Sequence, residues 1–132
     1  MTADVQTPKT SYQYVVLRCV PRVEREEFIN VGVVLYAQAT NFLAAAWRTD
    51  PQRLAALDPR LDLERVHRAL HFIEAVCAAD PRIGAPATPS PGQRFGFIKA
   101  PRSTILQPGP VHGGVTDDPA RQLDHLLHCL VG

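Results

Sequence analysis

Two stretches rich in β-branched residues lie close together near the start of the chain, and they restrict the possible folds most. In residues 12–20, YQYVVLRCV, the side chains alternate between two faces, with Val15, Leu17 and Cys19 on one of them. The run from Phe28 to Ala37, FINVGVVLYA, follows after a short charged link. Such residues favour a pleated backbone, and short links join antiparallel neighbours. We therefore expect two consecutive antiparallel strands.

Three further segments have the composition of strands. Residues 42–48, FLAAAWR, follow the turn-forming QATN and would complete a meander, although their alanines also suit a helix. Residues 94–98, RFGFI, and 103–107, STILQ, are expected to be short strands by their β-propensity. Residues 80–93 contain four prolines and two glycines, so we expect an extended surface loop there.

Asp-Pro pairs mark expected helix starts, because an aspartate can cap a helix while proline fills its first position. The pairs are Asp50-Pro51, Asp58-Pro59, Asp80-Pro81 and Asp118-Pro119. After Asp62, apolar residues recur at helical spacing up to Cys77, which predicts a long amphipathic helix. The last helix, after Asp118, would turn its leucines inward and its histidines to water.

This order of elements indicates an α+β fold. We expect an antiparallel sheet of about five to six strands, covered by one long amphipathic helix and a C-terminal helix. Residues 1–11 are polar and without periodicity, so they are predicted to be a flexible N-terminal tail. Residues 12–132 are predicted to form a single α+β domain.

Charge and composition restrict the function. The formal net charge is +1, from 14 basic and 13 acidic residues, so nucleic acid is not indicated as a partner. No apolar run is long enough for a membrane span, and we expect a cytoplasmic protein that does not contact a membrane. The three cysteines are far apart and lack a Cys-x-x-Cys pair, so we expect unpaired thiols without a chemical role.

The common chemical motifs are absent from the sequence. His67, His71 and Glu74 lie on one helix but lack the metalloprotease order, because Arg68 stands where the glutamate would be. His125 and His128 lack a third ligand nearby. Neither a glycine-rich phosphate loop nor a nucleophile elbow occurs. We therefore expect no metal site and no cofactor.

Two segments carry polar residues that the fold alone does not require. In the first, Arg18 interrupts an apolar strand, and a charge there needs a partner or a cleft. In the second, residues 100–120, prolines and glycines fix the path of a segment rich in polar groups, where binding residues tend to occur. The ligand-binding candidates are Arg18, Arg22, Asn30, Arg102, Ser103, Gln107 and His112, and the catalytic candidates are His112, Asp117 and Glu27.

The leading hypothesis is a binding module whose pocket joins the two segments and takes an anionic small molecule or a protein partner. Arg18, Arg22 and Arg102 would contact phosphate or carboxylate, since a guanidinium can grip either with two hydrogen bonds. A purely structural salt bridge from Arg18 to Glu27 or Asp117 is the alternative. A hydrolase or nuclease acting on a phosphate ester is a second reading, with His112 as acid or base.

Both segments resemble a bacterial family known as domain of unknown function 3037. The resemblance is carried by YQYVVLRCVPRVEREEFINVGVVLY, residues 12–36, and APRSTILQPGPVHGGVTDDP, residues 100–119. Members of that family usually have Arg-Gly-Glu where this chain has Arg25-Glu26-Glu27. This departure leaves Glu27, but not Glu26, as a site candidate. The resemblance also implies a regulatory role beside a partner such as a HipA-like kinase.

Overall fold

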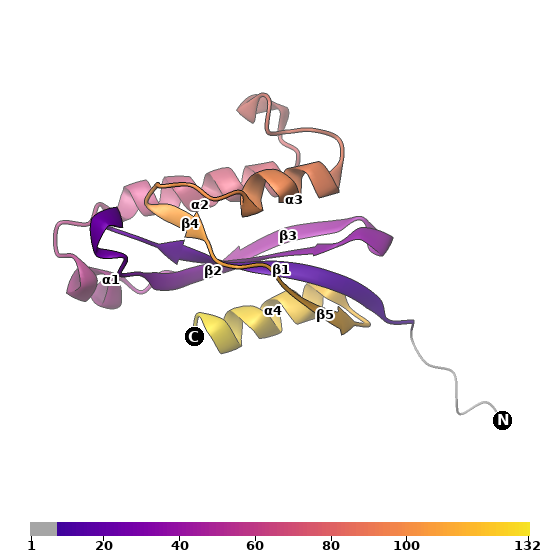
Figure 1. Ribbon diagram of the computed structural model, residues 1–132, viewed down its shortest axis with the longest axis horizontal. Coiled ribbons are helices and arrows are strands. Elements are labelled where there is room, and N and C mark those ends of the chain that lie inside the picture. Colours follow the sequence, from indigo (N-terminus) through magenta and orange to yellow (C-terminus); the bar gives the residue numbers. More distant parts are fainter. Residues whose placement is uncertain (1–7) are drawn as a thin grey trace.

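The computed structural model describes residues 8–132, which form one five-stranded antiparallel sheet with helices on both of its faces (Figure 1). β2 and β3 lie on one side of β1, while β4 and β5 pair one after the other with its opposite edge. The strands are β1 (Thr10–Cys19), β2 (Ile29–Ala37), β3 (Phe42–Trp47), β4 (Leu106–Pro108) and β5 (His112–Thr116).

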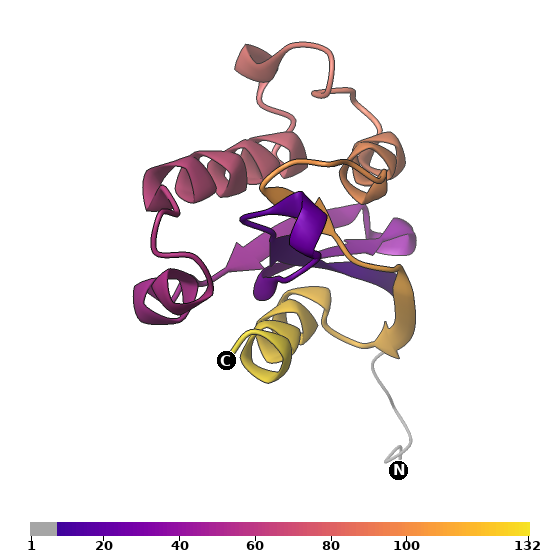
Figure 2. The same cartoon turned by 60° about the vertical axis from the view of Figure 1, so that its left-hand side comes forward.

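Two helical layers enclose the sheet. Both views show the long helix α2 and the shorter α3 on one face and α4 on the other (Figures 1 and 2). The predicted α+β class, with its long helix and its C-terminal helix, is confirmed. The helices are α1 (Pro51–Leu57), α2 (Leu63–Cys77), α3 (Pro91–Lys99) and α4 (Pro119–Leu130), with 3₁₀ turns η1 (Val23–Arg25), η2 (Gln38–Thr40) and η3 (Pro81–Ile83).

The central strands β1 and β2 are apolar on both faces because both faces are covered. Val15 and Val34 are fully buried under α2 and α3, whereas Val33 and Leu35 are fully buried against α4. Successive side chains of a strand point to opposite faces, so alternate residues supply the two cores.

A β-bulge shifts the alternation at the end of this pair. Leu17 pairs with Gly32 and Arg18 pairs with Asn30, which leaves Val31 as the extra residue of β2. Gly32 is needed here, because a Cβ atom would lie 3.0 Å from the carbonyl oxygen of Ala46 in β3. Beyond the bulge, Arg18 and Asn30 turn toward the α4 side of the sheet.

The helix starts agree with the sequence at three aspartates and differ at two. Asp50, Asp62 and Asp118 accept backbone N–H groups of the first turn of α1, α2 and α4. Asp58 instead ends α1, since its own N–H is bonded to the carbonyl of Leu54 and a turn follows. Asp80 caps only the 3₁₀ turn η3.

The prediction of a strand at residues 94–98 is wrong. This segment belongs to α3, which Ser90 caps and Pro91 opens. Its apolar residues Phe95 and Ile98 are three apart, so a helix turns both into the core beneath. The strand expected at residues 103–107 is confined to Leu106–Pro108.

The first strand begins earlier than predicted. Thr10 and Ser11 pair with Thr116 and Val115 of β5, so β1 includes two residues assigned to the tail. The part of that tail before residue 8 lies outside the described residues. Within residues 8–132, no helix has both the length and the apolar character needed to cross a membrane.

Arg94 provides a test of the α3 packing. It is 8% exposed, and its guanidinium donates to the carbonyls of Thr88, Pro89 and Cys77 at 2.6, 3.0 and 3.4 Å. Arg94→Met should lower the free energy of unfolding by roughly 2–3 kcal/mol, because it leaves these carbonyls without their donor. Gln93→Met, at an exposed neighbouring position, should change it by less than about 0.5 kcal/mol. Chemical denaturation measures both, and equal effects would refute the role of Arg94.

Candidate functional site

An apolar groove that rises from the core lies between α2 and the segment that leads from α3 into β4. Its cavity volume is about 550 Å³. Figures 1 and 2 show residues 100–105 running from α3 toward β4 alongside α2. Buried aliphatic side chains of four elements, β1, α2, α3 and β4, form the floor, namely Leu17, Ile73, Ile98 and Leu106. Ala69, Phe72, Ile105, Thr104 and Pro108 complete the walls together with three arginines, Arg65, Arg68 and Arg102.

Arg102 comes from the wall opposite α2 and is held in place by α3. Its guanidinium lies 4.8 Å from the ring centroid of Phe97. It donates to the carbonyl oxygens of Phe97 and Ala100. Partial burial lowers its pKa, because desolvation disfavours the charged form. An arginine still remains charged at neutral pH, so Arg102 presents a partly desolvated cation to the groove.

The other two arginines belong to α2. Arg65 and Arg68 are three residues apart on its exposed side, so they lie on one face of the helix. Arg68 has a distant ion pair with the exposed Glu64, at 4.0 Å. None of the described residues that line the groove is acidic. The groove therefore concentrates positive charge in a chain whose formal net charge is only +1.

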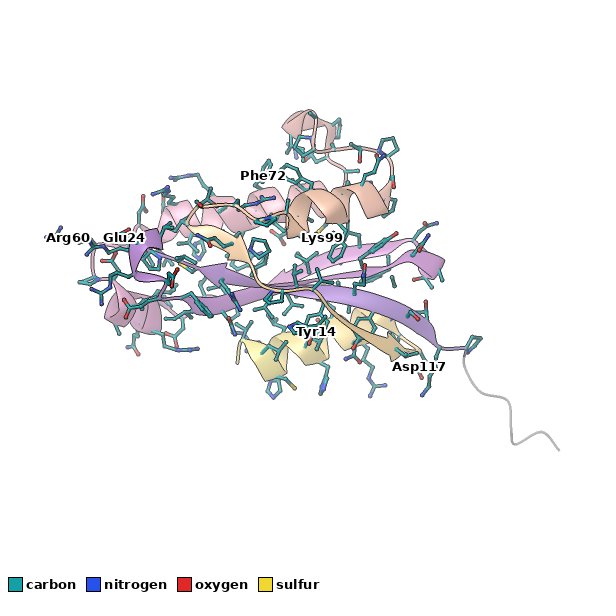
Figure 3. All side chains as sticks on the ribbon, in the orientation of Figure 1. Tyr14, Glu24, Arg60, Phe72, Lys99 and Asp117 are labelled. Atoms are coloured by element: carbon teal, nitrogen blue, oxygen red, sulfur yellow. The ribbon has the colours of Figure 1, made fainter. Side chains whose placement is uncertain are left out.

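Two exposed aromatic rings lie beside the groove. Phe72 of α2 and Phe97 of α3 are each 37% exposed, and their ring centroids are 6.2 Å apart in an edge-to-face arrangement. Figure 3 shows Phe72 on the outer side of α2, close to α3. Because large aromatic side chains are normally buried, this pair extends the apolar surface of the groove to the solvent.

Three of the candidates from the sequence form a row across three strands, on the other face of the sheet. Arg18 of β1 pairs in register with Asn30 of β2 and with Gln107 of β4. Asn30 donates to the carbonyl of Leu130 in α4, and Gln107 donates to the carbonyl of Thr104. The structure thus brings these three together but separates them from Arg102.

Within residues 8–132, Arg18 contacts an aromatic ring and not the carboxylate that the alternative of a structural salt bridge would require. Its guanidinium lies 4.2 Å from the ring centroid of Phe28. A Cβ atom at Gly109 would lie 3.2 Å from the guanidinium. The missing side chain at this position therefore leaves room for the guanidinium beside the backbone. Its buried Nε has no hydrogen-bond partner among the described residues. Neither Glu27 nor Asp117 forms an ion pair with it.

Arg22 and Glu27 lie in the turn between β1 and β2, outside the groove. Arg22 pairs with Glu24 at 2.9 Å, and Glu27 pairs with Arg25 at 2.5 Å. The guanidinium of Arg25 lowers the pKa of Glu27 through a hydrogen bond and its charge. All four side chains are exposed, and solvent weakens such pairs. These residues fix the turn locally.

The catalytic candidates do not meet. His112 is exposed and stacks on Tyr14, with ring centroids 5.2 Å apart. Asp117 follows the end of β5, so its backbone lies roughly 15 Å further along the strand direction. Figure 3 shows Tyr14 and Asp117 on the sheet face opposite Phe72. Ser103 is exposed between two residues that line the groove.

The groove arginines of α2 were missed by the sequence reasoning, although a signal was present. Arg65, Arg68 and Phe72 recur at spacings of three and four, which places them on one helix face beside the buried one. Only the tertiary structure shows that Arg102 faces this stripe, because 30 residues separate it from Phe72 along the chain.

The histidines and acidic residues do not form a metal centre within residues 8–132, where no three potential ligands cluster. His67 contacts the hydroxyl of Thr49 at 2.9 Å and packs against Trp47. His71 contacts Glu74 at 2.9 Å on the surface of α2. His67 therefore contributes to the packing of α2 against β3, whereas His71 forms a contact along α2.

Fold and site together define a small α+β protein with a basic, apolar groove over one face of an antiparallel sheet. The chain belongs to the family described as "Protein of unknown function (DUF3037)", whose sequence profile matches residues 14–131. This membership confirms the resemblance of the two segments. No curated protein and no solved structure matches the chain.

Glu26 occupies a backbone conformation that favours glycine. Its backbone is in the left-handed region, with φ 56° and ψ 19°. A side chain is unfavourable in this conformation. Glu26→Gly should raise the free energy of unfolding by roughly 0.5–1 kcal/mol in a denaturation experiment. Glu26→Ala keeps the unfavourable backbone conformation and removes only the charge. An equal rise in the free energy of unfolding of that variant would show that the charge, and not the backbone conformation, causes the effect.

The thiols differ in accessibility. Burial raises the pKa of Cys19 to about 11 and that of Cys77 to about 12, whereas Cys129 is exposed. Because the thiolate is the reactive form, an aromatic disulfide reagent at pH near 8 should label only Cys129 quickly in the native protein. All 3 cysteines should react in denaturant. Rapid labelling of more than one thiol in the native state would contradict the packing of β1 or α2.

Proposed function

We propose that the protein is a binding module for an anionic ligand, which docks in the groove between α2 and residues 100–108. One observation carries the proposal: three guanidinium groups from two walls face an apolar cavity that no described acidic residue lines. The anion-binding role inferred from the sequence is retained for Arg102. Arg65 and Arg68 take the places that the sequence assigned to Arg18 and Arg22.

The energetics of Arg102 favour an anionic occupant. A cation taken partly out of water loses hydration, and a paired anion compensates for that loss. Its hydrogen bonds to two backbone carbonyls orient the guanidinium without neutralising its charge. A phosphate, sulfonate or carboxylate can accept charge-assisted hydrogen bonds from such a group. The ligand therefore supplies the negative charge that the protein itself does not place there.

The size of the groove suits a small molecule. Ligand pockets of proteins typically measure about 300–1,000 Å³ and combine apolar walls with a few polar groups. The cavity of about 550 Å³ lies within this range. The arginines would fix the orientation of the ligand, and the aliphatic floor would supply contact area.

A matched pair of fluorescent probes tests this proposal. Anilinonaphthalene sulfonate carries an anion, and N-phenylnaphthylamine has the same ring system without it. The wild-type protein should bind the sulfonate about tenfold more tightly than the neutral probe, because charge-assisted hydrogen bonds form only with the sulfonate. The combined variant Arg65→Gln, Arg68→Gln, Arg102→Gln should lose that preference in a fluorescence titration.

A control variant with the same net charge separates the groove from the overall field of the protein. Arg53→Gln, Arg60→Gln and Arg121→Gln together remove three exposed arginines outside the groove. This variant should keep the preference for the sulfonate. Equal binding of the two probes by the wild type, or an equal loss in both variants, would refute the proposed site.

A further inference from the structure

We infer that the ligand is a free amphiphilic anion with an unbranched hydrocarbon body, of the chemical class of a fatty acid. This inference rests on the proposed function and names the ligand class for the same groove. It follows from the side chains that form the buried floor of the groove.

The inner surface of the groove provides almost nothing to recognise a polar ligand body. Its buried floor consists of Leu17, Ile73, Ile98 and Leu106. Thr104 is the one uncharged polar side chain among the described lining residues, and its hydroxyl already donates to the carbonyl of Leu106 at 2.7 Å. A sugar or a nucleobase placed here would lose hydrogen bonds to water without replacement. A hydrocarbon chain would lose none.

The charged and apolar parts of the groove are arranged for a ligand with one anionic end. Arg65 and Arg68 are exposed on α2, and Arg102 faces them from the opposite wall, whereas the aliphatic floor is buried beneath. A carboxylate could be held between the two walls while its chain covers the floor. Phe72 and Phe97 add exposed apolar surface next to Arg102. A small inorganic anion would leave this surface uncovered.

A chain-length series tests the inference. Acetate, octanoate and dodecanoate are titrated as monomers against protein that carries bound anilinonaphthalene sulfonate. The affinity should rise with length, on the order of threefold per methylene until the floor is covered, because each methylene leaves water. Dodecanoate should displace the probe at least tenfold more effectively than dodecanol or dodecylammonium, which match its chain but lack its charge.

Two variants that narrow the groove provide a second readout. Ala69→Leu fills the wall of α2, and Thr104→Phe fills the opposite wall from an exposed position, where the fold should tolerate it. Each should weaken dodecanoate binding at least tenfold and leave the weak binding of acetate unchanged. Ala56→Leu, on the exposed side of α1, is the matched control and should bind dodecanoate like the wild type.

The possible outcomes separate this inference from the proposed function. If the sulfonate probe binds through the arginines but affinity does not increase with chain length, the amphiphile is refuted and the anion site stands. If vesicles of anionic phosphatidylglycerol bind in an arginine-dependent way while monomeric dodecanoate does not, a lipid surface replaces the free acid. If charge has no effect on the binding of any probe, both proposals fail.

Discussion

The β1–β2 pair is buried on both of its faces, and the positions of α2, α3 and α4 follow from this burial. Val15 and Val34 need cover from α2 and α3, and Val33 and Leu35 need it from α4. Each fully buried aliphatic side chain contributes about 1.5–3 kcal/mol to the stability of the fold relative to an exposed one. Loss of either helical layer would therefore strongly destabilise the protein. The chain must therefore pass from α3 in one layer to α4 in the other. The groove lies along the first part of this connection, residues 100–105, which leads from α3 to β4.

The groove exists because α2 and the segment after α3 meet over the same core without closing against each other. Residues 100–105 cross from α3 to the short strand β4, whose Leu106 and Pro108 face the cavity. Arg102 is fixed to α3 by two carbonyls and the ring of Phe97, so its charge is presented from a rigid position. Because Arg102 is already held in one orientation, less side-chain entropy is lost when a ligand binds.

Much of the fold could be predicted from periodicity and capping. The β1–β2 alternation, the Asp62 cap and the leucines of α4 all agree with the structure. Residues 94–98 could not be assigned locally, because alternating large side chains suit an edge strand as well as a helix whose Phe95 and Ile98 face inward. The helix prevails because Ser90 and Pro91 open it and Arg94 ties it to the preceding loop.

Periodicity, helix caps and the two segments at residues 12–36 and 100–119 were sufficient to predict the α+β class and the family, and they made Arg102 a candidate for binding. Which arginines lie together can be seen only in the folded chain. Arg18 and Leu17 are neighbours in the chain, yet alternation along β1 sends Leu17 into the groove and Arg18 toward Phe28 on the other face. Helical periodicity along α2 places Arg65 and Arg68 over that groove, where a residue more than 30 positions away meets them. The physical reason is that a strand and a helix fix the direction of each side chain locally, whereas the packing of the helix on the sheet fixes which of those directions converge.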